Sequence, residues 1–226
     1  MKVNEILKEL KKYIDKNYKN FNEKNIPTKQ KILGVRLPIL KKTARKISLN
    51  NPFEFIKADK NNIYELIMLE GLTLSYTKTS FINLLPYIEN FLIKVDNWAQ
   101  TDYVINNFKS ISETRKQHLK IILKWLNKNG IFFKRAALVS LIYYYTDKNY
   151  LKIIFDISLS IKSEDYYVYT ANAWLLTECL TKYPLKTIEF LKDSGLDEKT
   201  YKKTMQKIRE SKKIHEKYKK ILFSNN

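Results

Sequence analysis

Helical periodicity extends through almost all of this 226-residue chain. In residues 3–18 the apolar side chains recur at the spacing of one helix face, at Val3, Ile6, Leu7, Leu10, Tyr13 and Ile14. Only four glycines and five prolines are present, which leaves little material for tight turns and favours helices over hairpins. No window alternates apolar and polar residues in the way a strand does. The pattern predicts an all-α protein.

Further helices are expected beyond a loop that runs through Pro27 and Gly34. Pro38 and Pro52 each suit the first turn of a helix, and Ser163 suits an N-cap. These later helices are expected at residues 37–48, a short segment from 52, 61–78, 80–93, 97–108, 113–128, 131–146, 149–161, 165–182, 185–193, 198–209 and 211–222. The helix at 61–78 is apolar on a wide face and is expected to be central.

Two nearly equal spacings indicate a repeat. Trp98, Arg135 and Trp174 follow one another at intervals of about 37 and about 39 residues, close to the period of HEAT-type helical repeats. Short helices with short connections at this period favour an α-solenoid over a four-helix bundle. No Gly/Ser-rich or Pro-rich linker interrupts the chain. We therefore expect one curved superhelical domain over residues 1–226, with a concave basic groove.

The formal net charge of +19 points to an anionic partner. Nucleic acid and an anionic membrane surface both fit such a charge. Alternatively, the many lysines reflect an AT-rich genome and have no binding role, because Lys, Asn and Ile are abundant together. The first residues read as an amphipathic helix rather than a signal peptide, and no long uncharged stretch occurs. We expect a monomer that binds duplex DNA and no membrane. Only five arginines occur, so each is expected where Lys would not serve.

Cysteine and histidine usage argues for a protein without metal or cofactor. Cys179 is the only cysteine, so no disulfide framework is possible and a reducing cytoplasmic location is expected. His118 and His215 are far apart in the sequence, which supports no metal site. Neither a phosphate-binding glycine loop nor a nucleophile elbow is present.

Trp98 and Asp102 form the most informative pair of residues. They are four apart, so on a helix they share one face. The structural alternative makes Trp98 a core residue and Asp102 an exposed helix charge or a helix cap. Against it, Asp102 adjoins the apolar Val104 and Ile105, where an unpaired carboxylate would be costly. Asp96, in contrast, is explained as an N-cap.

Arg135 and Trp174 each have a functional and a structural interpretation. Arg135 precedes the apolar run AALVSLIYYY and could either grip a DNA phosphate or link neighbouring repeats through carbonyls or a carboxylate. Trp174 lies among small residues and could belong to a site or to the core. Trp125 has no matching carboxylate nearby and is expected in the core.

Taken together, six segments resemble the AlkD-type DNA alkylation repair family of helical-repeat DNA glycosylases. The segments are KILGVRLPILKKTARKI (31–47), YELIMLEGLTLSYTK (64–78), VDNWAQTDYV (95–104), FFKRAALV (132–139), YTANAWLLTECLTKYP (169–184) and KIRES (207–211). The resemblance implies a HEAT-like solenoid that holds duplex DNA. It also implies hydrolysis of the N-glycosidic bond of cationic alkylated purines such as 3-methyladenine and 7-methylguanine.

The resemblance assigns roles to four residues of this chain. Asp102 matches the catalytic aspartate, Trp98 and Trp174 match the two site tryptophans, and Arg135 matches the arginine that contacts DNA. The runner-up function is a non-catalytic helical-repeat protein that recognises DNA structure. A third functional hypothesis is a scaffold that binds an acidic protein. This hypothesis leaves the Trp98 and Asp102 pair unexplained.

The chain departs from some family members at four positions. Asn97 replaces an additional aromatic residue, Thr177 replaces a basic residue, and Tyr143 and Tyr145 replace lysines. Fewer cations in the groove would weaken the local contact with DNA, so these departures bear on affinity and substrate range.

Overall fold

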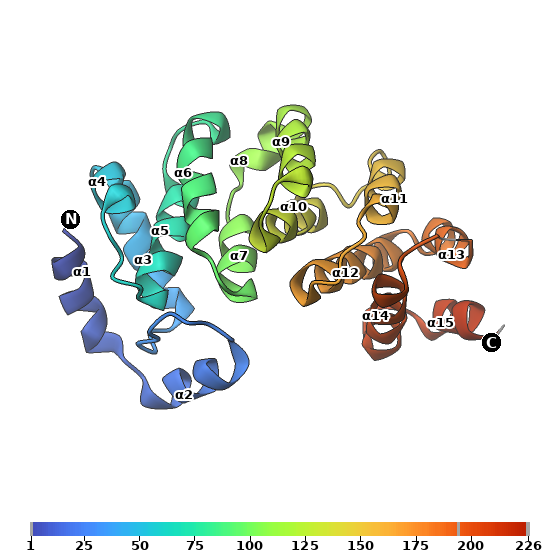
Figure 1. Cartoon of the computed structure of the whole chain (residues 1–226), viewed down its shortest axis with the longest axis horizontal. Helices are drawn as coiled ribbons and strands as arrows, with labels where there is room; N and C mark the ends of the chain where they lie inside the picture. The colour runs from blue at the N-terminus through green and yellow to red at the C-terminus, as the bar shows by residue number, and fades with distance from the viewer. Residues whose placement is uncertain (1, 194, 225–226) are drawn as a thin grey trace. The chain divides into compact units, whose positions relative to one another are not determined.

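All regular structure is helical in the computed structural model, which describes residues 2–193 and 195–224 (Figure 1). The described residues form fifteen α-helices and a 3-10 turn at Lys11–Tyr13. Extended pairing in this part of the chain is limited to isolated bridges between Ile14 and Val35 and between Lys31 and Ile63. The predicted all-α class is confirmed.

The first eight helices are α1 Val3–Leu10, α2 Lys16–Asn25, α3 Leu37–Ser48, α4 Pro52–Lys57, α5 Tyr64–Tyr76, α6 Phe81–Lys94, α7 Trp98–Ile105 and α8 Ser110–Glu113. The others are α9 Arg115–Asn127, α10 Ile131–Tyr144, α11 Leu151–Ser160, α12 Tyr166–Lys182, α13 Pro184–Lys192, α14 Glu198–Glu210 and α15 Glu216–Phe223.

The prediction of one N-terminal helix over residues 3–18 is wrong, because the helical conformation is interrupted between α1 and α2. Ile14 is extended and forms its bridge with Val35. The Asp15 carboxylate then accepts a hydrogen bond from the Tyr18 main-chain N–H at 3.0 Å, which starts α2 within the predicted helix. Helix α2 continues to Asn25, beyond the predicted end at residue 18. An aspartate that satisfies such an N–H group favours a new helix start over continuation of the old one.

Other helix starts show which local signals hold. Pro38 lies in the first turn of α3 and Pro52 begins α4, as predicted. Ser163 is not the cap of α12, because the Asp165 carboxylate accepts from the Tyr167 main-chain N–H at 2.8 Å. The local sequence thus predicts that a helix is present more reliably than it predicts which of several neighbouring polar residues caps it.

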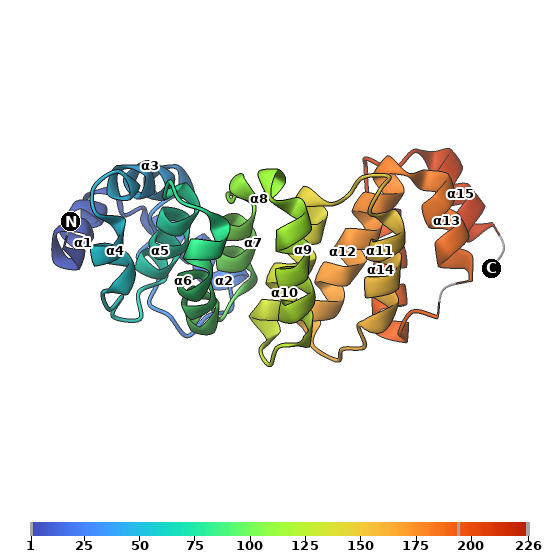
Figure 2. The same cartoon turned by 90° about the horizontal axis from the view of Figure 1, so that it is seen from above.

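The chain divides into two compact units, one up to Thr114 and one from Arg115 onward. In the first unit α3, α5 and α7 pack in that order, and α4 and α6 also pack on α5 (Figures 1 and 2). Helix α5 is buried on all sides from Tyr64 to Leu74, which confirms its predicted central position.

The second unit has the same plan of alternating packed helices. Helices α10, α12 and α14 pack in that order, with α9 on α10, α13 on α12 and α15 on α13. Trp125 of α9 is fully buried, as expected of a core residue. The apolar core of the later helices consists of Leu176, Leu180, Ile188, Leu191, Met205, Ile208 and Ile214. Such neighbour-to-neighbour packing is typical of helical repeats. The curved solenoid, its groove and the single-domain assignment stay predictions.

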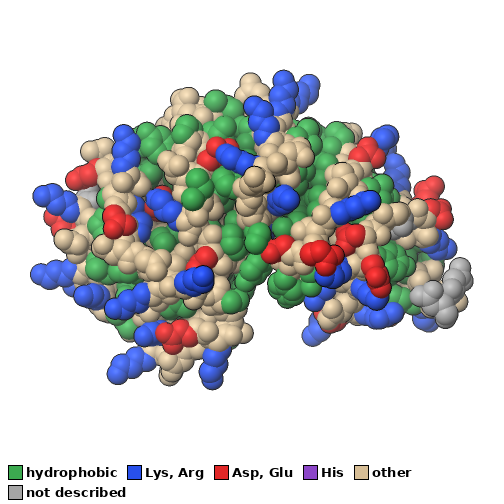
Figure 3. All heavy atoms as spheres, in the orientation of Figure 1, with side chains coloured by type: hydrophobic (Ala, Val, Ile, Leu, Met, Phe, Trp, Pro, Cys, Tyr) green, Lys and Arg blue, Asp and Glu red, His purple; other side chains and the backbone are tan. Residues whose placement is uncertain are grey.

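The surface of both units carries many cations. On the face drawn in Figure 3, Lys and Arg side chains project from each unit, with Asp and Glu side chains among them. None of the helices in the described residues is long and apolar enough to cross a membrane.

Candidate nucleic-acid site

Helix α7 places Trp98 at its first position and Asp102 one turn later. Trp98 is half-buried, whereas only 8% of the Asp102 surface is exposed. Burial, followed by the charges of Tyr18 and Asp102, raises the pKa of the neighbouring Tyr103 hydroxyl. Asp102 is therefore not an exposed helix charge. The sequence argument that placed this carboxylate close to the buried seam is confirmed.

The cap of α7 is Asn97 and not Asp96. The Asn97 side-chain oxygen accepts a hydrogen bond from the Gln100 main-chain N–H at 3.1 Å. Asp96 instead accepts from the Thr28 hydroxyl at 2.6 Å and from the Lys29 main-chain N–H at 2.8 Å. The prediction for Asp96 was wrong because a loop distant in sequence engages its carboxylate.

Arg135 is buried in α10 and contacts the following repeat helix. Its side chain is only 7% exposed, and Nη1 donates to the main-chain oxygen of Tyr167 on α12 at 2.9 Å. The guanidinium carbon also lies 5.9 Å from the centroid of the Tyr167 ring. The predicted link between neighbouring helices through a carbonyl is therefore present. DNA binding by Arg135 stays a prediction, and a guanidinium with five donors can serve both contacts.

Trp174 is half-buried on α12, and two neighbours contact its indole. The indole N–H donates to Oε1 of Glu178 at 3.2 Å. The Tyr143 ring packs edge-on against it, with ring centroids 5.8 Å apart at 90°. Glu178 also pairs with Lys213 at 3.5 Å. Sequence reasoning missed Glu178 and Lys213, although the spacing of four between Trp174 and Glu178 is that of helix neighbours.

The four predicted residues are divided between the two units. Trp98 and Asp102 share α7 in the first unit, and Arg135 and Trp174 lie on the adjacent helices α10 and α12 of the second. Their alignment along one groove stays a prediction.

Three of the four departures from the family pattern lie in the interior. Asn97 and Tyr145 are fully buried, and Thr177 is buried with its hydroxyl donating to the Ala173 main-chain oxygen at 2.7 Å. Tyr143, in contrast, is 40% exposed beside Trp174. At the three interior positions, the uncharged side chains are used for packing and internal hydrogen bonds in this chain.

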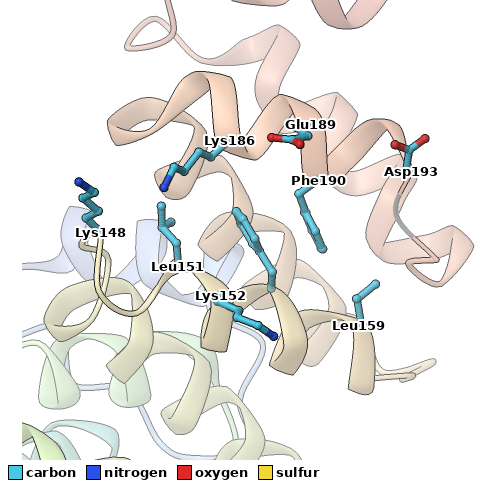
Figure 4. Close-up of a pocket in the computed structure, with 9 residues that line it drawn as sticks. Lys148, Leu151, Lys152, Leu159, Lys186, Glu189, Phe190 and Asp193 are labelled. Atoms are coloured by element: carbon cyan, nitrogen blue, oxygen red, sulfur yellow. The ribbon is translucent and has the colours of Figure 1, made fainter.

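A pocket of 510 Å³ lies between α11 and α13 in the second unit (Figure 4). The rings of Phe155 and Phe190 stack there with centroids 4.2 Å apart. Its lining residues are Lys148, Leu151, Lys152, Phe155, Leu159, Lys186, Glu189, Phe190 and Asp193. None of the four predicted residues is among them, so this pocket is separate from the candidate site.

A metal centre has no support in the geometry of residues 2–193 and 195–224. Among them, no group of three or more His, Cys, Asp or Glu side chains is placed to hold a metal ion. Cys179 is buried in α12, and burial raises the pKa of its thiol to about 12.

A family model described as DNA alkylation repair enzyme matches residues 6–212. The chain belongs to this family. The match covers most of the chain and includes Trp98, Asp102, Arg135 and Trp174. Among curated proteins, no significant match to the chain was found. Membership of the DNA alkylation repair enzyme family confirms the resemblance and implies that DNA is the substrate.

Proposed function

We propose that this DNA alkylation repair enzyme is a monofunctional glycosylase. It hydrolyses the N-glycosidic bond of cationic alkylated purines, such as 3-methyladenine and 7-methylguanine, in duplex DNA. The observation that carries the proposal is the buried carboxylate of Asp102, one helical turn after the half-buried Trp98 on α7. A carboxylate in such a place can stabilise positive charge that develops beside it, and the reaction creates such a charge on the sugar.

The reaction needs little acid catalysis at the departing base. A purine alkylated at the 3- or 7-position is already cationic and leaves without a strong acid. Positive charge instead builds on the deoxyribose as the bond to the base breaks. The Asp102 carboxylate would stabilise this oxocarbenium-like sugar and orient the attacking water. The faces of Trp98 and Trp174 would add about 1–2 kcal/mol each once water is excluded.

Arg135 is assigned to the DNA backbone in this proposal. Half or more of protein–DNA hydrogen bonds go to phosphate and sugar, and they set the register of the protein on the duplex. A buried arginine whose guanidinium is already held by the Tyr167 carbonyl would meet a phosphate with little loss of side-chain entropy.

The Asp102→Asn substitution tests the function directly. Removal of a charge aimed at the transition state costs roughly 3–4 kcal/mol, so excision of 7-methylguanine should fall at least about a hundredfold. Affinity for undamaged duplex should stay nearly unchanged. Base release would be measured from methylated duplex DNA with EDTA present.

The matched control is Asp156→Asn, because Asp156 is an exposed helical aspartate that binds Lys152 at 3.0 Å. It should keep the wild-type rate. A wild-type rate in Asp102→Asn would remove Asp102 from the mechanism, and a loss of thermal stability without loss of rate would indicate a structural role.

The charge of +19 also supports a second candidate, a non-catalytic helical-repeat protein that recognises DNA structure. Wild-type protein would then release no base but would bind duplex DNA with a steep salt dependence. A scaffold for an acidic protein would show neither property.

A further inference from the structure

The first turn of α7 rests on a buried polar network centred on Gln100. Its Nε2 donates to Oε1 of Gln30 at 2.7 Å and to the Tyr64 main-chain oxygen at 3.1 Å. Its Oε1 accepts from Nδ2 of Asn97 at 3.0 Å and from Nε2 of Gln30 at 3.3 Å. The amide therefore uses both donors and both acceptor sites.

The network joins segments that lie far apart in the sequence. Gln30 precedes α3 and also donates to the Lys94 main-chain oxygen, at the end of α6, at 3.1 Å. Asn97 donates to the Asp96 carboxylate at 2.9 Å, and Asp96 in turn accepts from Thr28 and Lys29. The start of α5, the end of α6, the loop at residues 28–30 and the start of α7 thus meet in one cluster.

Burial makes the geometry of this cluster restrictive. Asn97 and Gln100 are fully buried and Gln30 is 6% exposed. A buried amide that loses a partner is destabilised, so rotation or translation of α7 is opposed by several hydrogen bonds at once. Helix α7 spans only Trp98–Ile105, and a helix this short takes its orientation from its tertiary contacts.

We propose that Gln100, paired with Gln30, is a positioning residue that sets the orientation of α7 and so the placement of Trp98 and Asp102. Gln100 touches no reacting atom in this assignment and acts through the helix that carries both site residues. The assignment rests on the proposed glycosylase function.

The Gln100→Glu variant tests the proposal through its pH dependence. It replaces the donating Nε2 by an oxygen that faces Oε1 of Gln30 and the Tyr64 carbonyl, and burial raises the pKa of a carboxyl at this position. The ionised form repels both acceptors, whereas the protonated form can donate to one of them again. We expect single-turnover excision of 7-methylguanine to fall at least about tenfold at pH 8 relative to wild type.

The loss of excision rate in Gln100→Glu, relative to wild type, should be severalfold smaller at pH 5.5 than at pH 8. The affinity of the variant for undamaged duplex should equal that of wild type at both pH values. The other titratable groups around the network include Asp96, Asp102, the Tyr64 hydroxyl with its neighbours Tyr18, Glu65 and Tyr103, and Lys94, whose ammonium binds Glu70 at 2.8 Å. These groups are common to both proteins, so wild type at each pH is their control. Gln117→Glu makes the same change at an exposed position of α9 and should behave as wild type.

A readout that does not need excision uses 5-fluorotryptophan in place of the three tryptophans. The fluorine resonance of Trp98, assigned with Trp98→Phe, should move in Gln100→Glu at pH 8 and return toward its wild-type position at pH 5.5. The resonances of Trp125 and Trp174 should stay in place.

An unmoved Trp98 resonance together with a wild-type rate at pH 8 would overturn the positioning role. A moved resonance with an unchanged rate would overturn it as well, because α7 would then tolerate the displacement. If wild type releases no base, the glycosylase proposal fails, and the resonance of Trp98 still decides whether Gln100 orients α7.

Discussion

His118 is buried in the second unit against a tyrosine that occupies a lysine position of some family members. Its Nδ1 lies 3.1 Å from the Tyr145 hydroxyl, and that hydroxyl donates its only proton to the Arg115 main-chain oxygen at 2.7 Å. The histidine must therefore donate from Nδ1, which requires an N–H at that nitrogen. Tyr145 is thus an internal hydrogen-bonding residue, and a lysine here would have to bury its ammonium group.

The titration of His118 predicts a loss of stability in mild acid. Burial lowers the pKa of its imidazole to about 3, from its ordinary value of about 6.5. Below pH 6.5 the unfolded chain binds a proton that the folded chain does not, so stability falls as pH falls through the window between 6.5 and 3. At pH 5 this difference in proton binding by His118 lowers the free energy of unfolding by about 2 kcal/mol. In His118→Gln, the difference in unfolding free energy between pH 7.5 and pH 5 should shrink by about this amount in urea titrations.

His118→Asn is a second variant for this measurement, because it also removes the buried imidazole. It should show the same reduced difference between the two pH values. An unaltered difference in His118→Gln would show that other groups cause the acid sensitivity.

Helix α5 brings the family segments of the first unit together. The Glu65 carboxylate accepts hydrogen bonds from the main-chain N–H groups of Leu33, Gly34 and Val35, at 2.9, 2.7 and 3.2 Å. Gly34 has φ +95°, a conformation that favours glycine, and the tight turn there points these N–H groups at one acceptor. Burial raises the pKa of Glu65 against the opposing effect of those three donors. The buried Glu65 side chain therefore joins the segments at residues 31–47 and 64–78, whose helices α3 and α5 also pack against each other.

The close approach of α5, α6 and α7 predicts that Gly71→Ala is destabilising. A Cβ at Gly71 would lie 2.5 Å from Cγ2 of Val104 and 2.7 Å from Cζ of Phe91. Overpacking of this kind costs about 1–3 kcal/mol, more than the roughly 1 kcal/mol that alanine adds in helix propensity. We expect a net loss of up to about 2 kcal/mol in urea unfolding. Because Val104 belongs to α7, the excision rate should fall as well.

Gly195→Ala serves as the control for Gly71→Ala, since no atom lies within 4 Å of a Cβ built there. It should leave both the unfolding free energy and the excision rate near wild type. Equal stability of the two variants would mean that α7 moves aside freely, in conflict with the packing of the first unit.

At the scale of the whole molecule, the mechanism predicts which lesions are released. If Asp102, Trp98 and Trp174 act on the sugar, selectivity should follow the leaving-group ability of the base. Small and bulky adducts that are cationic at the 3- or 7-position should both be released. Hypoxanthine and 1,N6-ethenoadenine, which are neutral, should not.

Purified protein would be assayed on one small cationic, one bulky cationic and one neutral lesion in the same duplex. A site that extrudes the base into a fitted pocket would give strong discrimination by size and activity on some neutral bases. Efficient release of the neutral base would therefore contradict the sugar-centred mechanism.

The sequence by itself determined the features that depend on local spacing. Apolar positions at helical intervals identified most of the helices and the central place of α5, and Pro38 and Pro52 marked helix starts. The burial of Asp102 followed from its apolar neighbours in the same helix. Six ordered segments were enough to place the chain in its family. Each of these features is encoded within a few turns of chain, where periodicity and capping act.

Only the tertiary structure decided which polar side chains pair. Asn97 rather than Asp96 caps α7 because the loop at residues 28–29 engages Asp96. Arg135 reaches a carbonyl of α12, and Gln100 finds Gln30 across a sequence separation of 70 residues. A polar side chain has several partners of similar strength available, and the one that it takes depends on which segments the apolar core brings within hydrogen-bonding distance. That choice is made by packing between distant segments, which local periodicity does not encode.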